Sequence, residues 1–414
     1  MRNSGDVVTP MQTNSTEIRY LLNGPGSPES MTTLRALRPF DPLVKSFLSE
    51  LSEYLRGRVK GRQYPDITTF AFFIRKANLT LLEKPYDDRL VENVGRGLSF
   101  HIAPSNVPIN FAYSMVAGLL SGNACIVRVS EKEFPQVGIV CDAIKQVLSG
   151  DDYNQLKNYI CIIQYGHSQA INDRFSSICD IRVVWGGDQT ISSIRKSELP
   201  PRSLDISFSD RYSICLIDAA SYLSHEDKPV IAERFFNDTY LFDQNACSSP
   251  RLIFWLGDPP LVALAKKTFW HSVADVLHRK DYKTEAVTAV NKYVMFCRQA
   301  ILSSGMKLEG ETWGAITRLR LATLDTNLPQ FSCAGGYYVE YEDTSFEKLP
   351  EIINSKYQTL TYLGLNPCLL RDFLFQRGVK GVDRIVPIGE AASFSLTWDG
   401  YDLISQMTRK MVAL

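Results

Sequence analysis

The 414-residue sequence lacks several features that would place it at once in a broad class of proteins. No apolar run approaches the ~18 residues that a membrane-spanning helix needs. Residues 1–20 also lack the apolar core of a secretory signal peptide. Lys plus Arg and Asp plus Glu both number 45, so no net charge recruits nucleic acid or an anionic membrane surface. These absences predict a soluble, cytoplasmic protein with no nucleic-acid partner and no membrane span.

Metal and disulfide chemistry also lack their usual signals. The nine cysteines are scattered, without a CxxC pair and without Cys/His pairs at metal-ligand spacing. The sequence therefore predicts reduced thiols and no metal site. No GxGxxG segment occurs, which removes the standard dinucleotide fingerprint but leaves open other turns that present backbone N–H groups.

A regular alternation of strands and helices is present instead. Helices are predicted at 109–121, 135–148, 168–176 and 188–196. Strands are predicted at 98–103, 124–129, 159–165, 181–185, 204–208 and 212–218. This order predicts a parallel sheet of the Rossmann type, which binds dinucleotides at the carboxyl ends of its strands.

The expected domain organisation follows from these patterns. Residues 1–30, rich in Asn, Ser, Gly and Pro, predict a flexible or edge-packed arm. Residues 31–240 are expected to form the dinucleotide-binding domain with its N-terminal helices, and 241–388 a second α/β domain that carries the catalytic cysteine. Residues 389–414 are expected to pack back on the body. The predicted class is therefore α/β, with two domains.

Cys247 is the candidate nucleophile. It lies among small polar residues in the segment 243–250, between a helix predicted at 226–242 and a strand predicted at 251–256. Connections between elements are where reactive groups are usually presented. The alternative is a small buried hydrophobe, which is how cysteines in cores usually behave.

Two turns offer further chemistry. The segment 103–108 holds Asn106 between two prolines after a strand, where a fixed carboxamide could stabilise an oxyanion or simply tie down its own turn. Gly186 and Gly187 follow another strand, where free N–H groups suit a phosphate. The alternative there is an ordinary glycine turn with Asp188 as the N-cap.

Four motifs in order carry a family resemblance: residues 103–108, 121–131, 185–187 and 243–250. Together they resemble the aldehyde dehydrogenase superfamily, and within it the LuxC-type acyl-CoA reductases. The segments 384–389 and 398–402 also look like that family. The likeness spans residue 95 to the C-terminus.

The resemblance implies an aldehyde-dehydrogenase-like fold, with Cys247 as the acyl-accepting thiol and Asn106 as the oxyanion-hole carboxamide. It further implies that a nicotinamide dinucleotide lies along Ala103, Pro104, Ser105, Arg128, Ser130, Gly166, Trp185, Gly186, Gly187 and Thr190. An acyl thioester (acyl-CoA or acyl-protein) is the implied substrate, an acyl-protein synthetase the implied partner, and a homo-oligomer the implied assembly.

One departure from the superfamily bears on the reaction. Aldehyde-oxidising members carry a glutamate base ahead of the cysteine, and the matching segment here, 207–211, places Ser207 at that position. Without a base to activate water, a thioester on Cys247 is better suited to exchange with a thiol than to hydrolysis. A cation at Arg128, beside Ser130, favours NADPH, whereas Glu131 would suit NADH if it approached the 2′ position.

The predicted function is therefore NAD(P)H-dependent reduction of an acyl thioester to the aldehyde through a thioacyl-cysteine. Three alternatives stay open. The first is an NAD(P)-dependent aldehyde dehydrogenase that makes the acid. The second is a cysteine acyltransferase or thioesterase without redox chemistry. The third is a catalytically silent subunit of an acyl-transfer complex.

Overall fold

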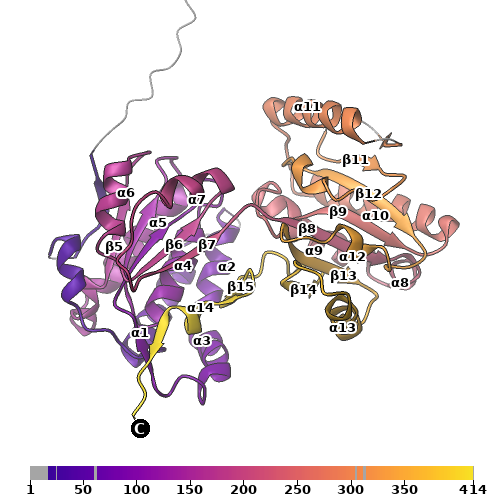
Figure 1. The fold of residues 1–414 in the computed structure, drawn as a ribbon. Coiled ribbons are helices and arrows are strands. Elements are labelled where there is room, and N and C mark those ends of the chain that lie inside the picture. The colour runs from indigo at the N-terminus through magenta and orange to yellow at the C-terminus, as the bar shows by residue number, and fades with distance from the viewer. Residues whose placement is uncertain (1–16, 25, 60–62, 304, 311–313, 414) are drawn as a thin grey trace, which may run out of the picture. The chain divides into compact units, whose positions relative to one another are not determined.

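The chain divides into two compact α/β units. The computed structural model describes residues 17–24, 26–59, 63–303, 305–310 and 314–413. The first unit holds the residues up to Ser209 and those from Leu403 onward, and the second holds Asp210–Asp402 (Figure 1). The boundary therefore lies at residue 209/210 and not at the predicted 240/241. The reason is that β8 (Tyr212–Asp218) pairs with strands of the second sheet.

The first unit is built on a six-stranded sheet in the order β1-β5-β4-β3-β6-β7. Its strands are β1 (Arg19–Leu22), β3 (Leu98–Ile102), β4 (Ala124–Val129), β5 (Ile160–Gln164), β6 (Ile181–Trp185) and β7 (Leu204–Phe208). The neighbours from β5 to β7 are parallel, as predicted, and β1 runs antiparallel to β5. Of the predicted flexible arm, residues 1–16 lie outside the described residues. Its segment 19–22 is an edge strand rather than a flexible one.

Helices connect the parallel strands of this sheet. They are α4 (Asn110–Leu120), α5 (Pro135–Leu148), α6 (Gln169–Ser176) and α7 (Asp188–Ile194), preceded by α1 (Pro42–Arg58), α2 (Pro65–Phe73) and α3 (Lys76–Glu83). Local signals explain their starts. Pro42 occupies the first turn of α1, where the Asp41 carboxylate accepts the Leu43 N–H at 2.9 Å. The predicted apolar helix, α4, is buried from Phe111 to Leu120.

The C-terminal residues return to the first unit. After α14 (Leu403–Gln406), β17 (Thr408–Lys410) pairs antiparallel with β2 (Asn93–Gly95). The Asn123 side chain donates to the Met407 carbonyl at 3.0 Å and accepts from the N–H groups of Arg96 and Gly97. The segment predicted at 389–414 is thus divided between the units, because residues 389–402 belong to the second.

The second unit is built on a seven-stranded sheet in the order β10-β11-β12-β9-β8-β13-β14. Besides β8, its strands are β9 (Pro250–Leu256), β10 (Lys307–Glu309), β11 (Thr317–Arg320), β12 (Tyr337–Asp343), β13 (Tyr357–Leu363) and β14 (Arg384–Pro387). Its pairs are parallel except that of β10 with β11. A small pair of strands, β15 (Thr397–Trp398) and β16 (Tyr401–Asp402), follows.

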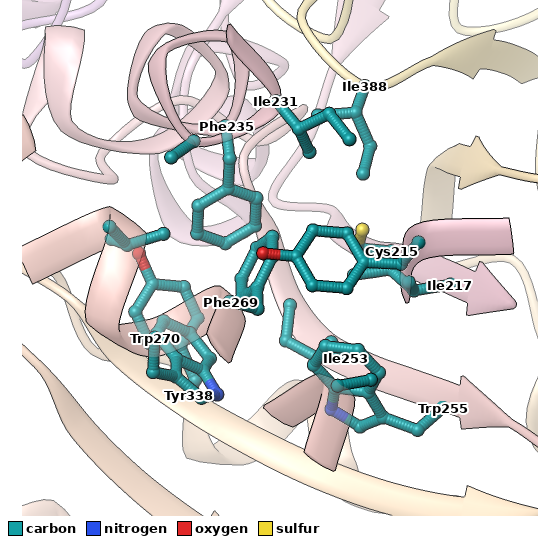
Figure 2. Close-up of a cluster of buried hydrophobic side chains, with 14 of the residues drawn as sticks. Cys215, Ile217, Ile231, Phe235, Ile253, Trp255, Phe269, Trp270, Tyr338 and Ile388 are labelled. Carbon is teal, nitrogen blue, oxygen red and sulfur yellow. The ribbon is translucent and has the colours of Figure 1, made fainter. Parts of the chain in front are cut away.

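Hydrophobic clusters cover both faces of this second sheet. Its helices are α8 (Ala219–Ser224), α9 (Lys228–Thr239), α10 (Pro259–Arg279), α11 (Ala286–Leu302), α12 (Leu349–Ile352) and α13 (Pro367–Arg377). Successive residues of β8 join different clusters, because side chains alternate between the faces of a strand. On one face, Phe235 of α9 packs edge-on against Phe269 and Trp270 of α10 (Figure 2). This packing fixes α9, which leads toward Cys247.

No helix in the described ranges is both long and apolar enough to span a membrane.

Candidate functional site

Cys247 lies on a short loop that joins two well-packed elements. The helix α9 continues into the 3₁₀ turn η5 (Tyr240–Phe242), and β9 begins at Pro250. Asp243 and Gln244 between them both adopt left-handed backbone conformations, with φ of 50° and 58°. Such conformations cost a residue other than glycine about 1 kcal/mol each. Contacts elsewhere in the loop must offset this strain.

The Gln244 side chain supplies those contacts. It is fully buried, and all four of the hydrogen bonds that a carboxamide commonly makes are present. Its Nε2 donates to the carbonyls of Pro250 (2.9 Å) and Tyr337 (3.2 Å). Its Oε1 accepts from the N–H groups of Gly336 and Tyr337, both at 2.9 Å. Gln244 therefore fastens the cysteine loop to the first residue of β12.

Arg251 holds the loop from the strand that follows it. The buried guanidinium donates to the carbonyls of Gln244 (2.7 Å), Ser249 (3.3 Å) and Ala246 (3.4 Å). These carbonyls flank Cys247 on both sides in sequence. The cation thus fixes the backbone around the thiol and places a positive charge near it.

Cys247 is half-buried as a residue, and its backbone carbonyl accepts a hydrogen bond from Ser213 Oγ at 2.7 Å. Burial raises its pKa, while a hydrogen bond from the Arg211 N–H and the charge of Arg251 lower it. Asp399 and Asp210 raise it as well, and the net shift is upward. The thiol is therefore largely protonated at neutral pH, and nucleophilic attack requires a proton to leave it.

The cysteines in apolar runs differ from Cys247. Cys125, Cys161 and Cys215 are fully buried, and burial raises the pKa of Cys125 and Cys161 to about 12. Such thiols stay protonated and inert.

The residues expected along the dinucleotide gather at one edge of the first sheet. Residues 103–105 follow β3, Arg128 and Ser130 lie at the end of β4, and Gly166 follows β5. Trp185 ends β6, with Gly186 and Gly187 after it and Thr190 in α7. These strands are parallel neighbours, so their carboxyl ends share one edge. The strand order reverses between β3 and β6, the position at which such sheets bind ligands.

Their side chains are engaged to different degrees. Trp185 is buried, its Nε1 donates to Ser114 Oγ at 2.9 Å, and its ring stacks on Phe208. The Trp185 side chain therefore fixes the carboxyl end of β6 through its packing and its hydrogen bond. A Cβ at Gly186 would meet Thr190 at 3.1 Å, so a larger residue would crowd α7. Gly187, not Asp188, is the N-cap of α7, and Asp188 is its first residue.

The charged pair at the end of β4 has specific contacts. Arg128 donates through Nε and Nη2 to the Tyr165 carbonyl (3.2 and 2.9 Å) and lies 5.3 Å from the centre of the Tyr165 ring. The Glu131 carboxylate lies against Gly166, where a Cβ would come within 2.5 Å of it. Ser130 Oγ accepts the Lys132 N–H at 3.1 Å. Arg128 thus binds the backbone carbonyl that follows the end of β5, and Glu131 occupies the space beside Gly166.

The remaining candidates are Asn106, Ser207 and the histidines. Asn106 is exposed on the turn after β3. Ser207 Oγ donates to Asp205 at 2.9 Å and accepts from Arg195 at 3.2 Å, so this position carries a hydroxyl already held by its neighbours. His101 is buried between Ser114 and Ser99, and burial lowers its pKa to about 3. His101 is therefore a neutral core residue.

No cluster of three or more His, Cys, Asp or Glu residues that could hold a metal occurs in the described ranges. Sequence reasoning missed Gln244, Arg251 and Arg211, whose contacts define the cysteine loop. Their proximity to Cys247 in the sequence was the one signal for Gln244 and Arg251, and Arg211 had none.

The fold is that of the aldehyde dehydrogenases. Aldehyde dehydrogenase 21 from Physcomitrella patens superimposes with a TM-score of 0.62 at 10% identity, over 92% of this chain and 86% of that one. A glyceraldehyde-3-phosphate dehydrogenase from Methanocaldococcus jannaschii, solved with NADP, superimposes with a TM-score of 0.60 at 12% identity, over 92% and 90%. At sequence identities of 10–12%, these superpositions show that the chain shares the fold of this class of protein, and they show nothing of its function.

A comparison with protein-family models places the chain in one family within this fold class. Residues 81–410 match the model of the acyl-CoA reductase (LuxC) family, and the chain belongs to it. The long-chain acyl-protein thioester reductase of Photorhabdus luminescens is 24% identical over 315 residues. That alignment covers 74% of this chain and 61% of the relative, so the chain spans about three fifths of the relative's length.

Proposed function

We propose that this chain reduces an acyl thioester to the corresponding aldehyde, with Cys247 carrying the acyl group. The observation that carries the proposal is the anchored cysteine loop. Cys247 is half-buried, and the side chains of Gln244 and Arg251 hold the backbone of its loop, in a member of the LuxC family. An anchored nucleophile reduces the entropy that must be lost on reaching the attack geometry.

In the proposed reaction, the Cys247 thiolate attacks the thioester carbonyl carbon. The oxyanion that forms accepts a hydrogen bond from the N–H of the Asn106 carboxamide. The bond from carbon to the donor sulfur then breaks, and the donor leaves as a thiolate that takes up a proton. The Arg211 N–H and the Arg251 charge, which lower the pKa of the thiol, favour the attacking thiolate. A bound reduced nicotinamide dinucleotide would supply the hydride to the acyl carbon. The bond from that carbon to the Cys247 sulfur would then break, releasing the aldehyde and returning Cys247 as a thiolate.

The first unit fits such a cofactor. Gly166 and Gly186 bring backbone to the carboxyl edge of the sheet at positions where a Cβ would meet Glu131 and Thr190. Residues 103–105 and 185–187 flank the reversal of strand order. We propose NADPH ahead of NADH because Arg128 is a cation at this edge. Glu131 is the residue that opposes this choice.

Ser207 supports reduction over oxidation. Its hydroxyl is hydrogen-bonded to Asp205 and Arg195, and a serine cannot activate water as a carboxylate does. The thioacyl group on Cys247 would therefore persist until hydride arrives. Since the P. luminescens relative is called an acyl-protein thioester reductase, we further propose that an acylated protein is the natural donor.

Intact mass spectrometry tests the proposal. Wild type, Cys247→Ala and Cys333→Ala are incubated with a long-chain acyl-CoA, and NADPH or NADH is then added. Cys333 is the matched control because it is a half-buried cysteine of the same unit. Wild type and Cys333→Ala should gain one acyl group and discharge it as aldehyde, while Cys247→Ala should gain none. An adduct that survives in Cys247→Ala, or free acid as the product, would contradict the proposal.

A further inference from the structure

A tight hairpin near the end of the second unit carries a buried carboxylate, that of Asp399. Asp399 and Gly400 join β15 to β16, and both adopt left-handed backbone conformations, with φ of 50° and 76°. Two successive positive φ angles define the type I′ turn, for which Asp-Gly is a preferred sequence. The Asp399 side chain is nevertheless withdrawn from water, with 4% of it exposed. Aspartates are rarely buried without partners, so the contacts of Asp399 define its role.

The contacts of Asp399 engage one of its two carboxylate oxygens. Its Oδ1 accepts a hydrogen bond from Gln358 Nε2 in β13 and lies 3.8 Å from Arg211 Nη1. Arg211 is also paired with a second carboxylate, since its Nη2 lies 2.6 Å from Asp383 Oδ2. Among the residues that the structure describes, no hydrogen bond or ion pair engages Asp399 Oδ2. This oxygen is therefore available to a proton.

Two parts of the structure hold both Asp399 and Cys247. One is Arg211, whose backbone N–H donates to the thiol while its guanidinium faces the carboxylate. The other is the start of β13, where the Thr359 N–H donates to Ser213 Oγ at 3.3 Å and that hydroxyl donates to the Cys247 carbonyl at 2.7 Å. The hairpin and the cysteine loop thus share their supports, and the carboxylate lies near enough for its charge to act on the thiol.

The charges around Asp399 indicate what it can do. As a carboxylate, it raises the pKa of Cys247. Burial raises the pKa of Asp399 itself, the charges of Arg211 and Arg384 lower it, that of Asp383 raises it, and the net shift is upward. A thiolate beside a carboxylate is therefore disfavoured. A proton that moves from the sulfur to the carboxylate instead leaves a single negative charge at the site.

We propose that Asp399 is the proton acceptor of the Cys247 thiol, an inference that rests on the proposed function and deepens it. The proton of Cys247 Sγ passes to Asp399 Oδ2, and the electron pair of the sulfur forms the bond to the thioester carbon. The bond from that carbon to the donor sulfur then breaks. The departing thiolate takes the proton from Asp399, which becomes a carboxylate again, and the donor leaves as a thiol.

The other carboxylate that acts on the thiol does not suit this role. Asp210 also raises the pKa of Cys247, but Asp210 is exposed. A carboxylate in water is a weaker base than one whose pKa burial has raised. Asp399 is the buried carboxylate of the two, and a long-chain acyl donor at the sulfur would separate the thiol from bulk water.

Two rates measured at pH 7 test the inference. The first is acylation of Cys247 by a long-chain acyl-CoA without nicotinamide, followed by quenched flow and intact mass spectrometry. The second is alkylation of Cys247 by iodoacetamide, a small reagent that lets water take the proton. Asp399→Asn should slow acylation about 100-fold or more, the range of general base catalysis. It should speed alkylation about 3-fold, half a pKa unit, because the carboxylate that disfavours the thiolate is gone.

Two matched controls separate this role from charge and from folding. Asp210→Asn removes the other carboxylate that raises the pKa of Cys247, so it should speed alkylation and leave acylation no slower than in wild type. Asp383→Asn removes the second carboxylate paired with Arg211 and should change neither rate by more than about 3-fold. Asparagine at 399 keeps the oxygen that accepts from Gln358, and thermal melting confirms that the variants fold.

The wild type provides a test that needs no substitution. Its acylation should rise at a lower pH than its alkylation, because a carboxylate that accepts the proton removes the need for prior ionisation of the thiol. Identical pH profiles for the two reactions would overturn the inference, as would an Asp399→Asn variant that is slowed equally in both.

Failure of the inference is distinct from failure of the proposed function. If wild type is acylated and Asp399→Asn is acylated equally fast, the role of Asp399 alone is overturned. If wild type gains no acyl group, the proposed function is overturned and this inference with it.

Discussion

The buried carboxamide of Gln244 makes a quantitative prediction, because a second buried glutamine of the same unit provides its control. Gln244 makes four hydrogen bonds to backbone groups. Gln299 is equally buried, yet its Oε1 accepts one hydrogen bond and its Nε2 has no partner within the described part of the chain. Leucine has a volume close to that of glutamine, so Gln→Leu at either site changes polar contacts more than packing.

The expected cost differs strongly between the two sites. Gln244→Leu leaves the N–H groups of Gly336 and Tyr337 buried without their acceptor, at about 1–3 kcal/mol each. It also releases the left-handed backbone at Asp243 and Gln244, whose strain the bonds offset. We expect a loss of about 3–5 kcal/mol in the free energy of unfolding. Gln299→Leu removes one hydrogen bond and should cost about 1 kcal/mol.

Urea unfolding and thiol labelling measure this difference. The midpoint of the transition that reports on the second unit should fall much further for Gln244→Leu than for Gln299→Leu. Under native conditions, Cys247 in Gln244→Leu should also react faster with a neutral maleimide, because its loop opens more often. Equal midpoints in the two variants would refute the view that Gln244 holds the cysteine loop.

Three further substitutions test other parts of the chain. Burial raises the pKa of Asp238 to about 7, so the stability linked to this carboxyl is full below its ordinary value of 3.8 and declines as the pH rises through 7. Asp238→Asn should flatten that decline in a plot of unfolding free energy against pH. An unchanged slope would show that Asp238 does not cause the decline. Arg251→Gln should raise the pKa of Cys247 and slow its alkylation by iodoacetamide at pH 7 about 10-fold, one pKa unit, with partial recovery in Arg251→Lys. If the pH profiles of alkylation coincide, the cation has no such role. Glu131→Gln should increase the ratio of kcat/KM for NADPH to that for NADH about 10-fold, the effect of 1.4 kcal/mol, and an unaltered ratio would place the cofactor elsewhere.

The arrangement of the first sheet was largely predictable from the sequence. The ranges of β4 and α5 agree with the predicted 124–129 and 135–148 residue for residue. Strands buried on both faces read as continuous apolar runs. Of the helices between them, α5 starts with proline and α6 with the capping side chain of Ser168. Such signals depend on neighbouring residues only, so they can be recognised from the sequence without knowledge of distant contacts.

The domain boundary was not predictable in this way. The strands β7 and β8 are separated by residues 209–211, yet they join different sheets. Which sheet a strand joins depends on hydrogen-bonding partners far away in the sequence, such as β13 for β8. Periodicity carries no information on that choice.

The surroundings of Cys247 show the same limit at the level of single residues. The position of the cysteine between a helix and a strand was visible in the sequence. Nothing local shows that Gln244 is fully buried, because its partners at residues 336 and 337 lie about ninety positions away. The left-handed backbone at Asp243 and Gln244 also lacks the glycine that usually marks it.

The return of residues 403–411 to the first unit has a consequence for the order of events during synthesis. The second unit is continuous from 210 to 402, so all of its strands have been translated before the last contacts of the first unit exist. The first unit begins earlier, but β2 stays unpaired until β17 emerges, and the Glu92 carbonyl waits for the Met411 N–H. A chain cut after residue 402 would therefore contain every residue of the second unit but only a first unit whose β2 lacks its partner strand. The part of the protein that is translated first is therefore the part that completes its contacts last.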